Sequence, residues 1–327
     1  MQRNLMQYID DTLAKKRILI TGGAGFIGSN LAHYFQKYHV DAEVVIFDCF
    51  RNEETFSNGN LKSLGHFKNL LGFKGEVITG DINNKNDLER LRKQKFDYIF
   101  HQAAISDTTV MNQEMVLRSN LNAFKDLLDL CLESGAKMIY ASSAGVYGNT
   151  PAPNSIGSGE IPENVYGFSK LMMDNLNYQY LQKYPNLHSV GLRYFNVYGE
   201  NEFYKGKTAS MILQLGLQAL QNKKVRLFKM GEQKRDFVYI QDVIQANIKA
   251  MFAKKSGVYN VGSGVARSYN DIVSCLKQEL GNLEVEYFDN PYQFFQTHTQ
   301  ANIILTQEFL DYTPRFSLEI GIKNYLS

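Results

Sequence analysis

The chain has 327 residues, of which 44% are hydrophobic and 21% charged, and its formal net charge is +2. This composition is typical of a globular protein with one large or two smaller domains. A nearly balanced charge gives no reason to expect a nucleic-acid or membrane partner. No apolar run reaches the ~18 residues that a transmembrane helix needs.

The three cysteines, Cys49, Cys131 and Cys275, lie far apart and form no CxxC pair. Such sparse cysteines argue against both a disulfide framework and a zinc site, and the six histidines show no ligand spacing. The first 17 residues lack the apolar segment of a secretory signal. We therefore expect a cytoplasmic protein with reduced thiols and no bound metal.

Short apolar runs alternate with helical patterns through the first 200 residues. The predicted strands are residues 17–22, 43–48, 75–81, 98–104, 137–143 and 188–199, and the predicted helices are 26–38, 85–94, 114–134 and 166–184. The strands are rich in Val, Ile, Phe and Tyr without strict alternation, which is typical of strands buried on both faces of a parallel sheet. The alternation predicts a doubly wound α/β sheet.

The last third of the chain is less regular. We expect helices at 208–222 and 268–280, strands at 225–231, 257–264 and 284–288, and a strand or loop followed by a helix within 235–252. The segment "GNTPAPNSIGSGEIPEN" (148–164) predicts a long loop. Because long loops in compact domains often cover active sites, this one is a candidate cover.

The segment "TGGAGFIG" follows the first predicted strand and opens the first predicted helix. Its glycines, Gly22, Gly25 and Gly28, permit a tight turn and let the backbone approach a pyrophosphate at the helix N-terminus. Asp48 ends the second strand 20 residues beyond Gly28, where an acid can bind a ribose hydroxyl. These features predict a dinucleotide site and a Rossmann fold.

The choice between NAD and NADP stays open at this point. Asp48 alone favours NAD, whereas Arg51 could pair with the 2′-phosphate of NADP. Asp81 ends the third strand, from which it could reach the adenine. In "HQAAISD" (101–107), the small residues after the fourth strand would let the backbone lie against the cofactor, while His101 is expected to be packed in the core.

Four motifs together carry a family resemblance. "TGGAGFIG", "HQAA", "YASSAGVYG" and "NVYGFSK" occur in this order, each at a predicted strand end or helix start. The chain resembles the extended short-chain dehydrogenase/reductase family of nucleotide-sugar epimerases and dehydratases. "LRYFNVYGENEFYKGKTAS", "LFKMGEQKRDFVYIQDV" and "HTQANI" resemble the branch of that family that acts on ADP-linked heptoses in lipopolysaccharide core synthesis.

The resemblance implies inversion of a carbinol centre, C6 of the heptose, that has no acidic C–H. Oxidation by a tightly held NADP (NAD is the alternative) and hydride return to the opposite face would achieve this. Tyr166 is the expected base, and Lys170, one helical turn away, would favour its phenolate. Ser143 would bind the reacting oxygen, and Lys205 would be the second acid/base.

The resemblance implies further binding residues. For the cofactor they are Phe26, Ile27, Gln102, Ala103, Ala104, Asn120 and Val197, and for the substrate they are Asn196, Phe228, Gly231, Arg235 and Tyr292. Three positions depart from the family pattern. Cys49 stands where asparagine is usual, Lys207 where a small polar residue is usual, and Phe295 where a substrate-contacting tyrosine is usual. Nearby Tyr292 could substitute for that tyrosine.

We assign residues 1–196 and about 235–263 to the NAD(P)-binding domain, and about 197–234 and 264–327 to a smaller α/β substrate-binding domain. The expected partners are an ADP-heptose and further copies of this chain. A UDP-hexose 4-epimerase is the main alternative. A dehydratase is disfavoured, because Ala144 and Gly145 replace the Asp-Glu pair of those enzymes, and a non-catalytic member would have lost Tyr166 or Lys170.

Overall fold

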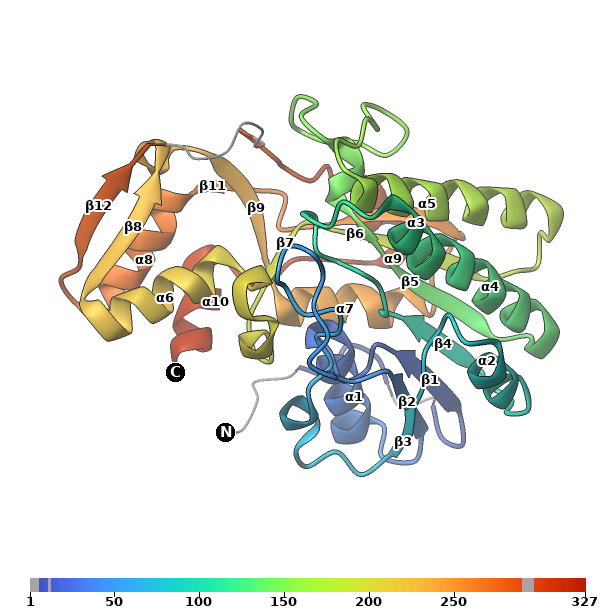
Figure 1. Ribbon diagram of the computed structural model, residues 1–327. Helices are drawn as coiled ribbons and strands as arrows, with labels where there is room; N and C mark the ends of the chain where they lie inside the picture. Colours follow the sequence, from blue (N-terminus) through green and yellow to red (C-terminus); the bar gives the residue numbers. More distant parts are fainter. Residues whose placement is uncertain (1–5, 11–12, 290–296) are drawn as a thin grey trace.

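A seven-stranded sheet forms the larger part of the protein (Figure 1). The structure is a computed structural model and describes residues 6–10, 13–289 and 297–327. The strand order is β10-β6-β5-β4-β1-β2-β3, and every neighbouring pair is parallel. The strands are β1 (Arg17–Thr21), β2 (Glu43–Asp48), β3 (Glu76–Thr79), β4 (Tyr98–His101), β5 (Lys137–Ser143), β6 (Ser189–Tyr194) and β10 (Gly257–Val261). This is the doubly wound α/β fold that the sequence predicts.

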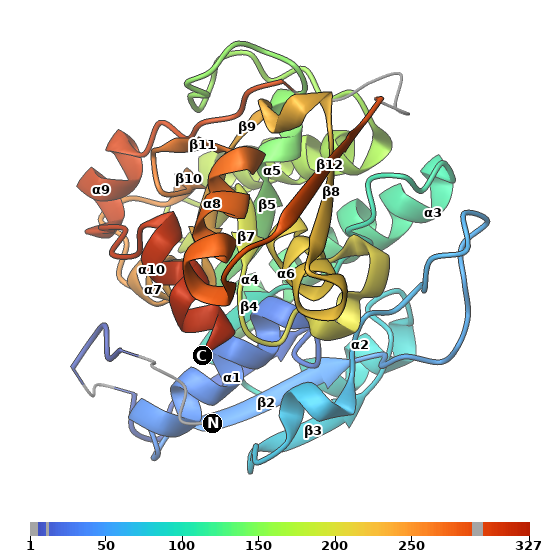
Figure 2. The same cartoon turned by 90° about the vertical axis from the view of Figure 1, so that its left-hand side faces the viewer.

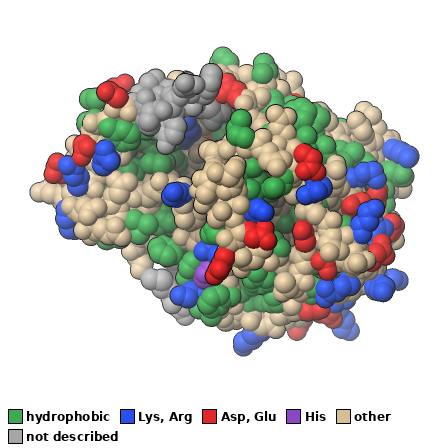
Figure 3. All heavy atoms as spheres, viewed as in Figure 1, with side chains coloured by type: hydrophobic (Ala, Val, Ile, Leu, Met, Phe, Trp, Pro, Cys, Tyr) green, Lys and Arg blue, Asp and Glu red, His purple; other side chains and the backbone are tan. Residues whose placement is uncertain are grey.

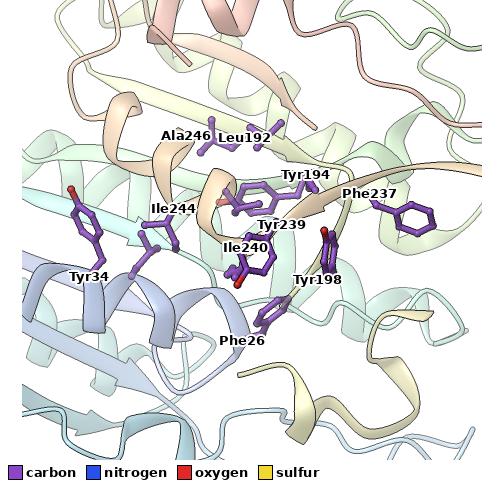
Figure 4. Packing of buried hydrophobic residues seen from close by; sticks show 14 of the residues in the cluster. Phe26, Tyr34, Leu192, Tyr194, Tyr198, Phe237, Tyr239, Ile240, Ile244 and Ala246 are labelled. Carbon is purple, nitrogen blue, oxygen red and sulfur yellow. The ribbon is translucent and has the colours of Figure 1, made fainter. Parts of the chain in front are cut away.

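Helices cover both faces of this sheet because its strands are apolar on both. Ile18 and Ile20 of β1 pack on one face, and Leu19 between them packs on the other. The first face carries α1 (Phe26–Tyr38), α7 (Ile240–Ala250) and α9 (Ile304–Leu310), and the second carries α2 (Lys85–Arg92), α4 (Ala123–Ser134) and α5 (Val165–Lys183). Figure 4 shows Tyr34 of α1 near Ile244 of α7 in the first cluster. Each such buried side chain contributes about 1.5–3 kcal/mol.

A smaller unit stands beside the large sheet (Figures 1 and 2). It contains the strand pair β8 (Lys224–Phe228) and β12 (Glu284–Phe288), the sheet β11-β9-β7, and three helices. The remaining elements are β7 (Asn196–Tyr198), β9 (Lys234–Tyr239), β11 (Ala266–Ser268), α6 (Met211–Asn222), α8 (Tyr269–Leu280) and α10 (Leu318–Leu326). The core continues from the large sheet into this unit through Tyr198 and Tyr239.

Four local predictions from sequence are wrong. The strand expected at 188–199 is divided into β6 and β7, which belong to different sheets. The expected helix 114–134 is divided into α3 (Gln113–Leu117), a π-helical turn at Arg118–Asn122, and α4. The expected strand 225–231 ends at Phe228, because Met230 and Gly231 adopt positive φ. The loop 148–164 lines no part of the main cleft; it is held by Asn154, which bridges to Ala301, and by Glu160, which pairs with Arg193.

Among the described residues, no helix is both long and apolar enough to cross a bilayer. Side chains of both charge signs are mixed over the face shown in Figure 3, without a large area of one sign. The surface therefore offers no extended basic patch on that face for a polyanion.

Candidate active site

A cleft of about 810 Å³ lies at the carboxyl ends of the large sheet's strands and reaches the smaller unit. Its floor includes the ends of β1 and β4, which are neighbours although β2 and β3 come between them in sequence. Open α/β sheets bind ligands at such a reversal of strand order. The fold therefore places the candidate site where sequence and topology both predict it.

The glycine turn after β1 leaves room only for backbone. Gly22 has φ +68°, and a Cβ there would lie 2.6 Å from the backbone nitrogen of Ala103. A Cβ on Gly28 would lie 2.3 Å from the carbonyl oxygen of Gly22. Helix α1 begins here with no side-chain cap and no acidic residue in its first turn. Its free N–H groups and positive dipole end fit a diphosphate.

Asp48 lines the cleft but also organises the backbone around it. One carboxylate oxygen accepts a 2.9 Å hydrogen bond from the Ala24 N–H, and the other accepts a 2.8 Å bond from the Phe50 N–H. The side chain is 5% exposed, and burial raises its pKa. Asp48 therefore joins the glycine turn to the loop after β2, and remaining lone pairs can still face a ribose.

Tyr166, Ser143 and Lys170 meet on one wall of the cleft. Lys170 Nζ lies 5.9 Å from the centre of the Tyr166 ring and donates a 2.7 Å hydrogen bond to the carbonyl oxygen of Ala141. Burial raises the pKa of Tyr166, and a hydrogen bond with Ser143 lowers it. Burial lowers the pKa of Lys170 to about 8, while the charge of Asp174 opposes this. An ammonium at this place favours the phenolate.

Asp174 is a buried residue that the sequence motifs did not single out. Its carboxylate accepts hydrogen bonds of 2.9 Å from both Tyr140 and Ser142 and one of 2.8 Å from Nε of Arg193. Asp174 stands one turn after Lys170 in α5, so the i+4 spacing is the signal that could have identified it. The network fixes the end of β5 beneath the candidate catalytic group.

Lys205 approaches the same cleft from the smaller unit. It lies in the 3₁₀ segment η4 (Phe203–Thr208), and its Nζ is 5.4 Å from the centre of the Phe26 ring in the glycine turn. Burial lowers the pKa of Lys205, and the charge of Glu202 raises it. Glu202 is fully buried and accepts from the Gly199 N–H and from Ser210. Two candidate acid/base groups thus reach one cleft from different parts of the chain.

The structure brings most of the predicted site residues into the cleft. These are Gly22, Gly25, Phe26, Ile27, Gly28, Asp48, Asp81, Gln102, Ala103, Ala104, Ser143, Tyr166, Lys170, Asn196, Val197 and Lys205. Arg51, Asn120, Phe228, Gly231 and Arg235 do not line it. Tyr292 and Phe295 lie outside the described residues.

The residues outside the cleft have other contacts. Asn120 joins two segments, because it exchanges hydrogen bonds of 2.9 and 3.0 Å with the Ile105 backbone and donates one of 2.9 Å to Ser169. Arg51 Nη2 donates to the carbonyl oxygen of Tyr204. Arg235 is 8% exposed in β9, and burial lowers its pKa.

His101 is packed in the core, as the sequence predicts. It is 1% exposed, and its Nδ1 is 2.8 Å from the Thr21 hydroxyl. Burial lowers its pKa to about 3, so the ring stays neutral. The neutral ring packs on Phe124 and does not line the cleft.

Comparison with known proteins agrees with this geometry. Residues 18–262 match the NAD dependent epimerase/dehydratase family, which is three quarters of the chain. The chain belongs to the NAD dependent epimerase/dehydratase family. It is 33% identical over 318 residues to an ADP-L-glycero-D-manno-heptose-6-epimerase of Brachyspira hyodysenteriae, covering 94% of this chain and 96% of the relative.

Solved structures of this epimerase/dehydratase family superpose closely. The ADP-L-glycero-D-manno-heptose-6-epimerase of Helicobacter pylori is 61% identical, with a TM-score of 0.91 and 98% coverage of each chain. The UDP-glucuronic acid 4-epimerase of Bacillus cereus, solved with a fluorinated substrate analogue and NAD, is 29% identical, with a TM-score of 0.80 and coverage of 94% of this chain and 97% of its own. The chain is thus an epimerase of this family with a nicotinamide dinucleotide as cofactor, and the glycine turn and cleft fit such a group.

Proposed function

We propose that the protein interconverts ADP-D-glycero-D-manno-heptose and ADP-L-glycero-D-manno-heptose by inversion at C6. The observation that carries this proposal is that Tyr166 of α5 and Lys205 of η4, which are far apart in sequence, line the same cleft. The 61% identity to the Helicobacter pylori enzyme, over almost the whole of both chains, supports the same substrate.

Inversion needs two acid/base groups. The C6 oxygen loses its proton in one orientation of the substrate and regains a proton in another, so a different side chain lies near it each time. When bound, the nicotinamide would supply reversible hydride transfer at C6, and inversion requires that hydride removed from one face be returned to the other. Tyr166 takes the C6 hydroxyl proton of one epimer, assisted by Lys170, while Ser143 holds the reacting oxygen. Once the C6 carbonyl has rotated, Lys205 donates the proton that restores the hydroxyl. In the reverse direction the two roles exchange.

We assign the remaining residues to binding. The cofactor is held by the glycine turn together with Asp48, Asp81 and residues 102–104. The part of the cleft that it occupies is lined by Phe26, Ile27 and Val197. Asn196, Phe228, Gly231, Arg235 and Tyr292 serve the substrate. Asn120 acts indirectly, since its contacts with Ile105 and Ser169 hold the loop after β4.

For the cofactor we propose NADP. Lys62, in the loop after β2, lines the cleft, and its ammonium pairs with Glu54 at 2.9 Å. Arg51 adds a second cation in this loop, and its buried Nε has no hydrogen-bond partner among the described residues. To test this, the purified protein is denatured and the released dinucleotide is identified by chromatography. Recovery of NAD alone would contradict the proposal.

The substrate is tested by incubating the protein with ADP-D-glycero-D-manno-heptose and resolving the two C6 epimers by chromatography. A matched incubation with UDP-galactose tests the 4-epimerase alternative. Conversion of the heptose alone supports the proposed function. Conversion of UDP-galactose without conversion of the heptose would replace it with the alternative.

A further inference from the structure

The segment that carries Lys205 is short and is anchored on one side by its own residues. The Lys205 N–H donates a 2.9 Å hydrogen bond to the Glu202 carbonyl, and the Thr208 hydroxyl donates a 2.9 Å bond to the Lys205 carbonyl. Gly206 interrupts the turn with φ +59°. These contacts fix the local backbone shape. The residues just before the segment are tied to α1, because Asn201 donates a 2.9 Å hydrogen bond to Ser29 and Asn30 donates a 2.8 Å bond to the carbonyl oxygen of Glu200. Neither bond holds Tyr204 or Lys205 themselves.

A second anchor comes from the loop between β2 and β3. The ring of Tyr204 lies flat on the ring of His66, with centroids 3.8 Å apart and planes 3° apart. Arg51 donates to the carbonyl oxygen of the same Tyr204. Both the ring and the backbone of the residue next to Lys205 are therefore held by one loop of the cofactor side.

That loop is itself attached to the glycine turn. The His66 N–H donates a 3.0 Å hydrogen bond to the carbonyl oxygen of Ala24, and the Arg51 N–H donates a 2.9 Å bond to that of Gly65. His66 Nδ1 accepts a 3.1 Å hydrogen bond from the Lys68 N–H. This bond orients the imidazole ring independently of its contact with Tyr204. A continuous set of contacts leads from the turn expected to hold the diphosphate to the backbone of Lys205.

We propose that His66 and Tyr204 are positioning residues whose stacked rings seat the Lys205 ammonium in the cleft. This inference rests on the proposed function, because it assigns Lys205 a proton transfer at C6. Phe67 and Phe203, which flank the pair, are 61% and 57% exposed. The stack thus lies near the surface, and its loss removes little of the core while it releases the segment that carries the amine.

The size of the effect follows from geometry. A reacting group displaced by ~1 Å can cost on the order of 100-fold in rate. Loss of the stack should therefore act on kcat more than on folding or on KM. The conservative variant Tyr204→Phe keeps the ring and should restore the rate, because no hydroxyl is needed for stacking.

The first test measures reduction of the bound cofactor in a single turnover with each C6 epimer separately. Tyr204→Ala and His66→Ala should slow reduction roughly 100-fold with the epimer that Lys205 deprotonates and leave the other epimer unchanged. Tyr204→Phe, and Leu71→Ala at an exposed position of the same loop, should match the wild type. Equal slowing with both epimers, or no slowing with either, would overturn the proposal.

The second test does not depend on activity. Acetylation of individual lysines is followed by mass spectrometry across a pH series, with exposed Lys207 as the internal control. Burial and Glu202 act on the Lys205 amine only while the segment is seated. In Tyr204→Ala and His66→Ala, the midpoint of the Lys205 profile should move upwards, toward that of an ordinary lysine. An unchanged midpoint would overturn the proposal.

Lys205→Met separates the two proposals. If Lys205→Met turns over like the wild type, the assigned chemistry of Lys205 fails, although the acetylation midpoint still reports whether the stack seats the amine. If Lys205→Met is inactive while Tyr204→Ala and His66→Ala behave as wild type in both tests, only the stacking proposal fails.

Discussion

Lys170 donates a 2.7 Å hydrogen bond to the carbonyl oxygen of Ala141, so the ammonium is tied to the end of strand β5. The side chain is 1% exposed, and it faces the ring of Tyr166. Helix α5 alone would leave a long lysine free to sample several rotamers. The strand removes this freedom. Four predictions concern this wall of the cleft, the buried network behind it, and the glycine turn.

The first prediction concerns pH. Because burial lowers the pKa of Lys170 to about 8, the ammonium is present below that pH and lost above it. The phenolate of Tyr166 loses its nearby cation as the amine deprotonates, so kcat/KM should fall as the pH rises through about 8. A guanidinium stays charged in this range, so Lys170→Arg should not show the fall even if its turnover is lower. If kcat/KM of Lys170→Arg falls over the same pH range as that of the wild type, the fall is caused by another titrating group.

The second prediction concerns the base. Tyr166→Phe should lower kcat by about 10²–10⁴-fold, the usual contribution of a general acid/base. The ring remains, so the amount of dinucleotide bound per chain should match the wild type. Epimer chromatography gives the rate, and the absorbance of the purified protein gives the cofactor content. Turnover close to that of the wild type would remove Tyr166 from the mechanism.

The third prediction compares two glycines with similar backbone. Gly22 and Gly135 have φ +68° and +73°, so alanine at either position costs about 1–2 kcal/mol of backbone strain. Only at Gly22 would the new Cβ meet the Ala103 backbone, since nothing lies within 4 Å of the Cβ built at Gly135. Gly22→Ala should therefore also lose bound dinucleotide. Denaturant unfolding measures the loss of stability, and the dinucleotide released on denaturation measures cofactor binding. Full retention of cofactor by Gly22→Ala would contradict the proposed role of the glycine turn in binding it.

The fourth prediction concerns the buried network behind the wall. Asp174→Asn leaves the fully buried Arg193 without its main counter-charge and should lower the free energy of unfolding by about 3 kcal/mol. The matched control, Glu133→Gln, breaks an exposed pair with Arg92 and should cost less than about 1 kcal/mol. Similar costs for both variants would show that the buried pair adds nothing beyond a surface one.

The large sheet and the glycine turn could both be predicted from the sequence. Both depend on local patterns: apolar strands, a turn that only glycine fits, and a helix that follows at once. The π-helical turn at Arg118–Asn122 was missed because its five residues carry an ordinary helical pattern. The turn forms where Asn120 meets Ile105 and Ser169, which are contacts that the local sequence does not encode.

The partners of Lys205 and Lys170 could not be predicted for a related reason. His66 and Tyr204 belong to loops that only the fold brings together. Glu202 and Asp174 are acids within one helical turn of each lysine, yet sequence spacing does not reveal that they are buried. Motifs therefore identified groups that line the cleft, and the residues that hold those groups emerged only from the packing.

The last strand of the large sheet has a consequence for synthesis on the ribosome. β10 pairs with β6, yet it leaves the ribosome more than sixty residues later, after β7–β9 and α7. Until then the side of β6 that faces away from β5 is an open sheet edge, made of six residues that are all buried in the finished protein, and such an edge can join another chain. We therefore expect a chain that ends before residue 257 to aggregate more readily than the full chain.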